Sequence, residues 1–219
     1  MFHDILDVLM RHEVQVEIAV KSFQHIYLSF ISEFIAICFA VPSGIFLTRC
    51  KWGAETIMNA VSMLQTIPSL ALLAFMIPIL GIGTLPTVVA LFLYALLPIM
   101  RSTYTAIRQV NPSTVEAAKA MGMTTIQILI KVEIPMSVPI IMNGIRMSSV
   151  MIIGWATLGA YIGAGGLGDL IMAGFATLSN GHIIAGAVPV TLLALLTDGI
   201  LGSFEKRMTF SGKRRSAFR

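Results

Sequence analysis

The sequence predicts an all-α integral membrane protein that crosses the bilayer about five times. Its 219 residues are 56% hydrophobic and only 12% charged, and the mean hydropathy is +0.85. A soluble domain of this length needs more charge to cover its surface. Five apolar stretches are long enough for a bilayer, which takes roughly 20 helical residues. They cover residues 25–48, 57–80, 85–104, 138–160 and 183–204.

Several of these stretches contain prolines, which are common in membrane helices and costly in soluble ones. The prolines in question are Pro42, Pro68, Pro78, Pro98 and Pro189. A sixth, re-entrant or partial helix around residues 166–180 stays open at this point.

The chain divides into one transmembrane domain with two short flanks. We expect an extracytoplasmic or interfacial segment over residues 1–23, the transmembrane domain over 24–205 and a basic cytoplasmic tail over 206–219. The N-terminal segment has acidic residues where a signal peptide has its positive region. Its apolar residues recur at helical spacing, which fits an amphipathic interfacial helix or a packed arm equally well. They are Phe2, Ile5, Leu6, Leu9 and Met10.

The basic residues predict the orientation. With the N-terminus outside, 13 of the 15 Lys and Arg residues belong to inside segments, Arg146 among them, and only Arg11 and Lys21 lie outside. The positive-inside rule favours this arrangement strongly. The net charge of +4 is therefore spread over the ends of segments and not massed on one face, so we expect no nucleic-acid partner.

One polar stretch, EAAKAMGMTTIQILIKVEIP at residues 116–135, interrupts the apolar spans on the predicted inner side. Ser113 or Thr114 is expected to cap a helix whose first turn holds Glu116, which suits the helix dipole. Gly122 is expected to end this helix as a C′ residue. A second helical piece leads to Pro135, where the next span can begin. Such short helices need something to pack against, and an amphipathic loop on the lipid surface is the alternative.

The spacing within this stretch resembles the EAA loop of ABC importer permeases. The matching residues are Glu116, Ala117, Ala118, Gly122, Val132, Ile134 and Pro135. Val132 and Ile134 depart conservatively, because the family usually has Ile and Leu there. Longer stretches resemble the osmoprotectant branch, which carries glycine betaine, carnitine, choline and similar quaternary amines. They are VPSGIFLTR (41–49), LQTIPSLALLAFMIPILGIG (64–83), ALLPIMRSTYTAI (95–107) and IIGWATLGAYIGAGGLGDLI (152–171).

The resemblance implies a type I ABC importer transmembrane domain of the MetI-like kind, in the bacterial cytoplasmic membrane. The loop would dock on a separate ATP-binding subunit, present in two copies, with Glu116, Ala117, Ala118, Gly122 and Pro135 shaping the coupling contact. An extracytoplasmic substrate-binding protein and a second permease, identical or paralogous, would complete the complex. The sequence has no GxxxxGK[ST] motif, so we expect a transport subunit without cofactor or catalytic residues, and ATP hydrolysis in another chain.

Polar residues within the spans are the candidates for the translocation path or its gate. We select Gln65, Thr66 and Pro68 in the second span and Asn143 in the fourth. Glu33 adds a carboxylate that would attract a quaternary ammonium.

Glu33 and Asp198 are the two acidic residues well inside apolar spans, where ionisable groups are costly and often functional. The structural alternative is a hydroxyl partner such as Ser29 or Thr197, or a contact between subunits.

Two further patterns carry no function. Residues 163–168, GAGGLG, match G-x-G-x-x-G, but they follow an apolar span without a βαβ context, so we interpret them as a glycine-rich connection or re-entrant turn. The histidines have no metal-ligand spacing and are expected at the surface; they are His3, His12, His25 and His182.

Three alternatives remain. A secondary transporter driven by an ion gradient favours inverted repeats, and no second copy of any span pattern is visible. A membrane enzyme requires a catalytic cluster on the spans, and the sequence offers none. An ABC permease for another small solute, such as an amino acid, shares the loop motif.

Overall fold

The computed structural model describes residues 8, 10–50 and 53–216, and within them every regular element is a helix. Four helices are long and apolar enough to cross a membrane, and a bent helix pair meets the same criterion when its two halves are taken together, which gives up to five. The predicted all-α fold with about five spans is therefore confirmed. The spans are α2 (His12–Arg49), α3 (Ala54–Thr66) with α4 (Ser69–Leu80), α5 (Thr84–Arg108), α8 (Ile134–Ala156) and α10 (Asn180–Ser216).

The first helix starts earlier than predicted. The sequence places the first span at 25–48, whereas α2 runs through 38 residues from His12. At 1.5 Å per residue it is about 57 Å long, which exceeds the roughly 30 Å of hydrocarbon in a bilayer. The helix therefore projects beyond the apolar layer. Of the five apolar residues assigned to the proposed amphipathic helix, only Met10 lies within the described residues, and its side chain is exposed.

The sequence stretch 57–80 suggested one continuous second span, but in the structure this span is broken. Helices α3 and α4 meet at an angle of 96°. The break falls at Ile67 and Pro68, where Ile67 is extended (φ −71°, ψ 128°). A residue before proline avoids the α conformation, and proline itself has no N–H to continue the ladder. The chemistry of proline therefore allows the chain to break at this point.

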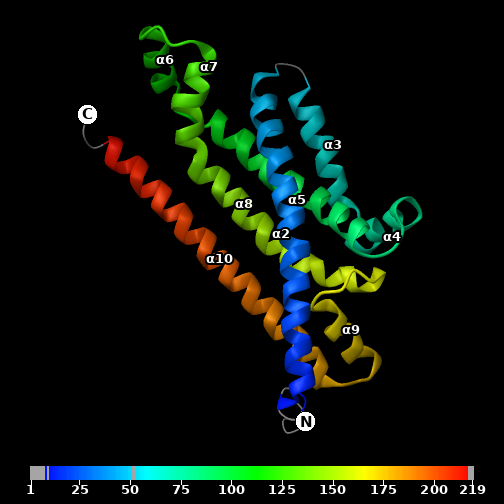
Figure 1. Cartoon of the computed structure of the whole chain (residues 1–219). Coiled ribbons are helices and arrows are strands. Elements are labelled where there is room, and N and C mark those ends of the chain that lie inside the picture. Colours follow the sequence, from blue (N-terminus) through cyan, green and yellow to red (C-terminus); the bar gives the residue numbers. More distant parts are fainter. Residues whose placement is uncertain (1–7, 9, 51–52, 217–219) are drawn as a thin grey trace.

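The core lies where α2, α5 and α8 pack together (Figure 1). Small residues bring these helices close, as is usual in membranes. A side chain added at Gly44 would lie 2.8 Å from the Thr103 Cβ, and one added at Gly144 would lie 2.3 Å from the Ser102 Cβ. The helices consequently cross almost backbone to backbone at these two points.

Replacing Gly144 with alanine is expected to weaken the contact between α5 and α8. The new methyl group would overlap Ser102, and such overpacking costs about 1–3 kcal/mol. Thermal unfolding in detergent measures the loss. Gly154→Ala in the same helix is the matched control, because a Cβ there meets nothing within 4 Å. Equal melting temperatures for the two variants would show that the close crossing is absent.

A compact group of short elements closes one end of the bundle. It consists of the 3₁₀ helix η2 (Thr157–Ile162), a glycine-rich connection and α9 (Gly168–Ala176). The partial helix left open for residues 166–180 thus exists as α9. Within the connection, Gly163, Gly165 and Gly166 have φ values of 74°, 84° and 85°, which favour glycine. The GAGGLG motif is therefore a tight turn, as predicted.

The two ends of the molecule differ in charge. The C-terminal ends of α2 and α10 lie at the same end as α6 and α7, opposite the N-terminal end of α2 (Figure 1). The basic side chains of this end are Arg49, Arg108, Lys119, Lys131, Lys206 and Arg207. The positive-inside rule assigns it to the cytoplasm. Arg146 is the exception to the predicted pattern, since it lies well inside α8 and not in an inner segment.

Candidate functional site

The polar stretch begins with helix α6 (Pro112–Ala120), which is capped differently from the prediction. The Asn111 side chain, and not Ser113 or Thr114, caps the helix by accepting a hydrogen bond from the Ser113 N–H at 3.0 Å. Pro112 occupies the first turn, where its missing N–H costs nothing. Glu116 therefore lies beyond the first turn, and the predicted benefit from the helix dipole does not apply.

Helix α6 ends at Gly122, as predicted. Gly122 has φ 78° and donates its N–H to the Lys119 carbonyl at 2.9 Å, while the Met123 N–H bonds the Ala118 carbonyl at 3.2 Å. These two bonds form a Schellman motif, which requires the left-handed conformation that glycine adopts without strain. The glycine thus fixes the direction in which the chain leaves α6.

The following helix is continuous with the next span. Helix α7 (Thr125–Ile128) starts with a capping box between Thr124 and Gln127. It passes through the π-helix η1 (Leu129–Glu133) directly into α8. Pro135 lies in the first turn of α8, as predicted, but no break precedes it. Short π segments often mark functional places in helices.

The predicted coupling residues do not all face outward. Glu116, Ala117, Gly122 and Pro135 are exposed, whereas Ala118 is only 2% exposed. Ala118 therefore packs α6 against its own chain, and its predicted part in shaping the coupling contact stays a prediction. The exposed side also includes two large apolar residues that the sequence interpretation missed, Met121 and Ile126, each 69% exposed.

An ion pair joins this segment to the first span. Arg49, in the last turn of α2, donates a hydrogen bond to the Glu133 carboxylate in η1. The Glu133 side chain is 8% exposed and that of Arg49 is 40% exposed. Sequence reasoning did not pair these residues, because they lie 84 positions apart. The available signal was a glutamate two residues before Pro135, at the start of a membrane span.

Three of the candidate path residues gather at the bend between α3 and α4. Gln65 donates a hydrogen bond to the Tyr94 carbonyl at 3.0 Å, and the Tyr94 hydroxyl donates to the Ile67 carbonyl at 2.7 Å. Thr66 bonds its own helix, and Pro68 starts α4. Broken helices with free backbone groups are common at solute sites in transporters. Asn143 lies apart from this group, on the exposed side of α8.

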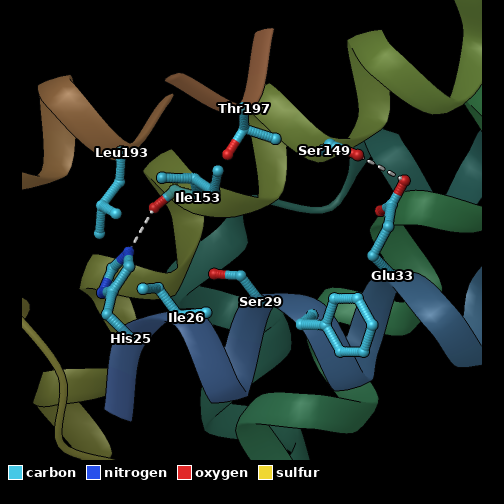
Figure 2. Close-up of a pocket in the computed structure, with 9 residues that line it drawn as sticks. His25, Ile26, Ser29, Glu33, Ser149, Ile153, Leu193 and Thr197 are labelled. Carbon is cyan, nitrogen blue, oxygen red and sulfur yellow. Dashed lines mark hydrogen bonds between the residues drawn. The ribbon is translucent and has the colours of Figure 1, made fainter. Parts of the chain in front are cut away.

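Glu33 lies in a second place, at a cavity between α2, α8 and α10 (Figure 2). Its carboxylate accepts hydrogen bonds from Ser148 and Ser149, each at 3.0 Å. The predicted alternative partners were Ser29 and Thr197, and both line the cavity without a recorded bond to Glu33. The cavity has a volume of about 130 Å³, and the buried Ser29 Oγ has no hydrogen-bond partner among the described residues. Polar groups with spare bonding capacity thus face an apolar cavity.

His25 also lines this cavity, which the sequence analysis did not foresee. It was expected at the surface, but it is fully buried, and its Nε2 lies 2.9 Å from the Ile153 carbonyl. Helix α2 begins thirteen residues before His25, so His25 lies inside the helix and not at its outer end. There α8 and the glycine-rich connection cover its side chain. The early start of α2 explains the error.

The second intramembrane carboxylate, Asp198, pairs with Arg146. The guanidinium donates from Nε and Nη2 to the two Asp198 oxygens at 2.5 and 2.7 Å, and from Nη1 to Glu205 at 3.2 Å. This bidentate arrangement joins α8 to α10. The structural alternative predicted a bonding partner for Asp198. Such a partner exists, but it is an arginine and not the predicted hydroxyl. An arginine inside an apolar run is itself a signal that a carboxylate lies nearby.

The chain resembles proteins of known function along almost its whole length. The family of binding-protein-dependent transport system inner membrane components matches residues 37–210. The chain belongs to this family. Among its relatives, the choline transport system permease protein OpuBB of Bacillus subtilis is 48% identical over 199 residues, which is 91% of this chain and 92% of the relative. The carnitine transport permease protein OpuCB of Listeria monocytogenes is 50% identical over 190 residues, 87% of each chain.

Solved structures share the fold of this transport family. The inward-facing MetNI methionine ABC transporter matches with a TM-score of 0.82 at 24% identity, over 91% of this chain and 99% of that one. An amino acid ABC transporter matches with a TM-score of 0.72 at 16% identity. The type I fold is thus confirmed. The chain is a permease subunit of an ABC importer in the inner membrane, and ATP hydrolysis belongs to a separate subunit.

Proposed function

We propose that this permease forms the membrane path of an importer for an osmoprotectant, a quaternary amine such as glycine betaine, carnitine or choline. The observation that carries this proposal is the high identity to the choline and carnitine permeases over almost the full length of both chains. A third relative, a glycine betaine/carnitine/choline permease of Bacillus subtilis, is 48% identical over 196 residues.

The segment from α6 to η1 is proposed to be the coupling contact with the ATP-binding subunit. Its exposed side combines Glu116 and Ala117 with the apolar Met121 and Ile126, at the basic end of the molecule. Exposed apolar side chains beyond the membrane are typical of protein interfaces. Gly122 and Pro135 set the geometry of this surface. Two ATP-binding subunits, a substrate-binding protein and a second permease, identical or paralogous, complete the proposed complex.

The translocation path is proposed to include the α3–α4 bend and the Glu33 cavity. Gln65, Thr66 and Pro68 contribute the polar groups of the bend, and Asn143 contributes an amide on α8. At the cavity, Glu33 supplies a negative charge, and Phe30 is an aromatic neighbour. A carboxylate and an aromatic ring both attract a quaternary ammonium.

Uptake by the reconstituted importer tests the substrate. The permease is placed in proteoliposomes with its ATP-binding subunit and substrate-binding protein, and labelled choline, carnitine, glycine betaine and methionine are offered in turn. We expect ATP-dependent uptake of at least one quaternary amine and none of methionine. Uptake of methionine alone would contradict the proposal.

Replacing Glu33 with glutamine is expected to raise KM for the quaternary amine about tenfold, which corresponds to about 1.4 kcal/mol of lost attraction. Glutamine keeps the size of the side chain and can still bond a serine, so the packing of α2 is preserved. Initial uptake rates against substrate concentration give the result. Glu55→Gln is the control, since Glu55 is exposed in the first turn of α3. An unchanged KM in the Glu33 variant would remove this residue from the path.

A further inference from the structure

Helix α2 is attached at its cytoplasmic end, and again in its outer part, to segments that we place on opposite sides of the membrane. At the cytoplasmic end, Arg49 bonds Glu133 in η1, directly after the proposed coupling segment. At the outer end, Lys21 bonds Asp169 in α9 at 2.5 Å, and the Gly166 N–H donates to the Gln24 side chain at 3.1 Å. The helix from Lys21 to Arg49 is unbroken and about 42 Å long at 1.5 Å per residue.

The cytoplasmic attachment is specific because Glu133 is buried. Its side chain is 8% exposed, so an unpaired charge there would be costly, and Arg49 supplies the compensating cation. The arginine is also the last residue of α2, where a positive charge suits the helix dipole. Between Thr124 and Glu133 the helical chain is continuous. Movement of α7 therefore displaces Glu133, and with it the end of α2.

The outer attachment is equally close. A Cβ at Gly165 would lie 2.7 Å from the Gln24 Oε1, and one at Gly166 would lie 3.1 Å from the His25 Nδ1. These left-handed glycines therefore place their backbone directly against α2. One turn further on, Asp169 holds Lys21. The connection between η2 and α9 thus follows α2 if that helix moves.

We propose that α2 is a continuous helical link that carries movement of the coupling segment to the outer glycine-rich connection, residues 163–168. Arg49 and Glu133 are its positioning pair on the cytoplasmic side, and Lys21 and Asp169 are the corresponding pair outside. This inference rests on the proposed docking of α6 and α7 with the ATP-binding subunit. It assigns a mechanical role to residues outside the coupling motif itself.

Charge exchange in the complete transporter tests the link. The variants are Arg49→Glu, Glu133→Arg and the double exchange, in nanodiscs with the ATP-binding subunit and substrate-binding protein. Arg101→Glu is the matched control, an exposed arginine of α5 with the same change of charge. The readouts are substrate transported per ATP hydrolysed, and hydrogen–deuterium exchange of peptides over residues 163–168 with and without ATP and vanadate.

In the wild type and in Arg101→Glu we expect an ATP-dependent change in exchange at the outer connection. The single exchanges should lose this change and lower transport per ATP at least about tenfold, within the usual range of coupling energies. The double exchange should restore both readouts. A wild-type response in Arg49→Glu, or no restoration by the double exchange, would overturn the proposal. The same holds if the wild type shows no ATP-dependent change.

A second set of variants is needed if the Arg49 and Glu133 variants do not assemble into the complete transporter. Lys21→Glu and Asp169→Lys, alone and together, alter the half-exposed outer pair. Each single variant should lose the outer response, and the pair should regain it; failure of this pattern would also overturn the link. Glu116→Lys separates the two levels of the account. If it leaves transport intact, the coupling function fails; if it uncouples transport while the exchanges do not, only the link fails.

Discussion

Replacing Glu116 with lysine is expected to abolish ATP-driven uptake while the permease still inserts into the membrane and folds. Glu116 is exposed and makes no recorded bond within the described chain, so its replacement should alter stability by no more than about 0.5 kcal/mol. In the proposed complex its charge would face the ATP-binding subunit. Uptake and ATP hydrolysis measured in the same proteoliposomes should show hydrolysis that no longer drives transport.

The control for this prediction is Glu55→Lys, which makes the same change at an exposed position of α3 outside the coupling segment. It should transport normally. Uptake at the wild-type rate by the Glu116 variant, with all partner subunits present, would refute the assigned role.

Gly122 tests the same contact through its geometry. A bulky residue has room at this position, since a Cβ meets nothing within 4 Å. The φ of 78°, however, is a backbone conformation that a bulky residue adopts only with strain. Valine should therefore turn the chain away from its path and uncouple transport. Asparagine should retain much more coupling, because it tolerates the left-handed conformation. Equal loss in the two variants would point to side-chain contact and not to backbone direction.

Replacing Arg146 with methionine is expected to reduce the yield and thermal stability of the folded permease more than any other single change considered. The substitution keeps the length of the side chain but removes the cation that binds both oxygens of Asp198 and joins α8 to α10. Carboxylates in an apolar span are costly when unpaired. Melting curves in detergent and the amount of monodisperse protein measure the effect.

Arg101→Met serves as the control for the Arg146 substitution, since it removes an exposed arginine from α5. The exchange of Arg146 and Asp198 should recover part of the stability, because the opposite charges again face each other. Wild-type melting by Arg146→Met would show that the ion pair does not hold α8 to α10.

Hydropathy was sufficient to predict an all-helical protein with about five spans, because it depends on averages along the chain. The bend at Pro68 was not predictable in the same way. Pro42, Pro98 and Pro189 lie inside continuous helices, whereas Pro68 lies in the break between α3 and α4 and caps α4. A proline alone therefore does not decide between a tolerated kink and a break; the packing of the neighbouring helices does.

The coupling segment was predictable to the extent that local chemistry fixes it. Gly122 ends α6 because it adopts a left-handed conformation, which lets the Gly122 and Met123 N–H groups bond carbonyls of the last helical turn. The burial of Ala118, and the pairs of Arg49 with Glu133 and of Arg146 with Asp198, depend on contacts between distant segments. A single sequence does not show such contacts, although each charged residue in an apolar segment indicates that it requires a partner of opposite charge or a hydrogen-bonding group.

Cross-linking from α6 to the ATP-binding subunit examines the central claim most directly. A single cysteine at Ala117, with Cys38 and Cys50 replaced, would be labelled with a short thiol-reactive photo-crosslinker and illuminated in the assembled importer, and a cysteine at the highly exposed Leu178 of the opposite end would serve as the control. We expect a covalent product with the ATP-binding subunit from position 117 and none from position 178. No product from position 117, or a product from position 178 alone, would contradict the account.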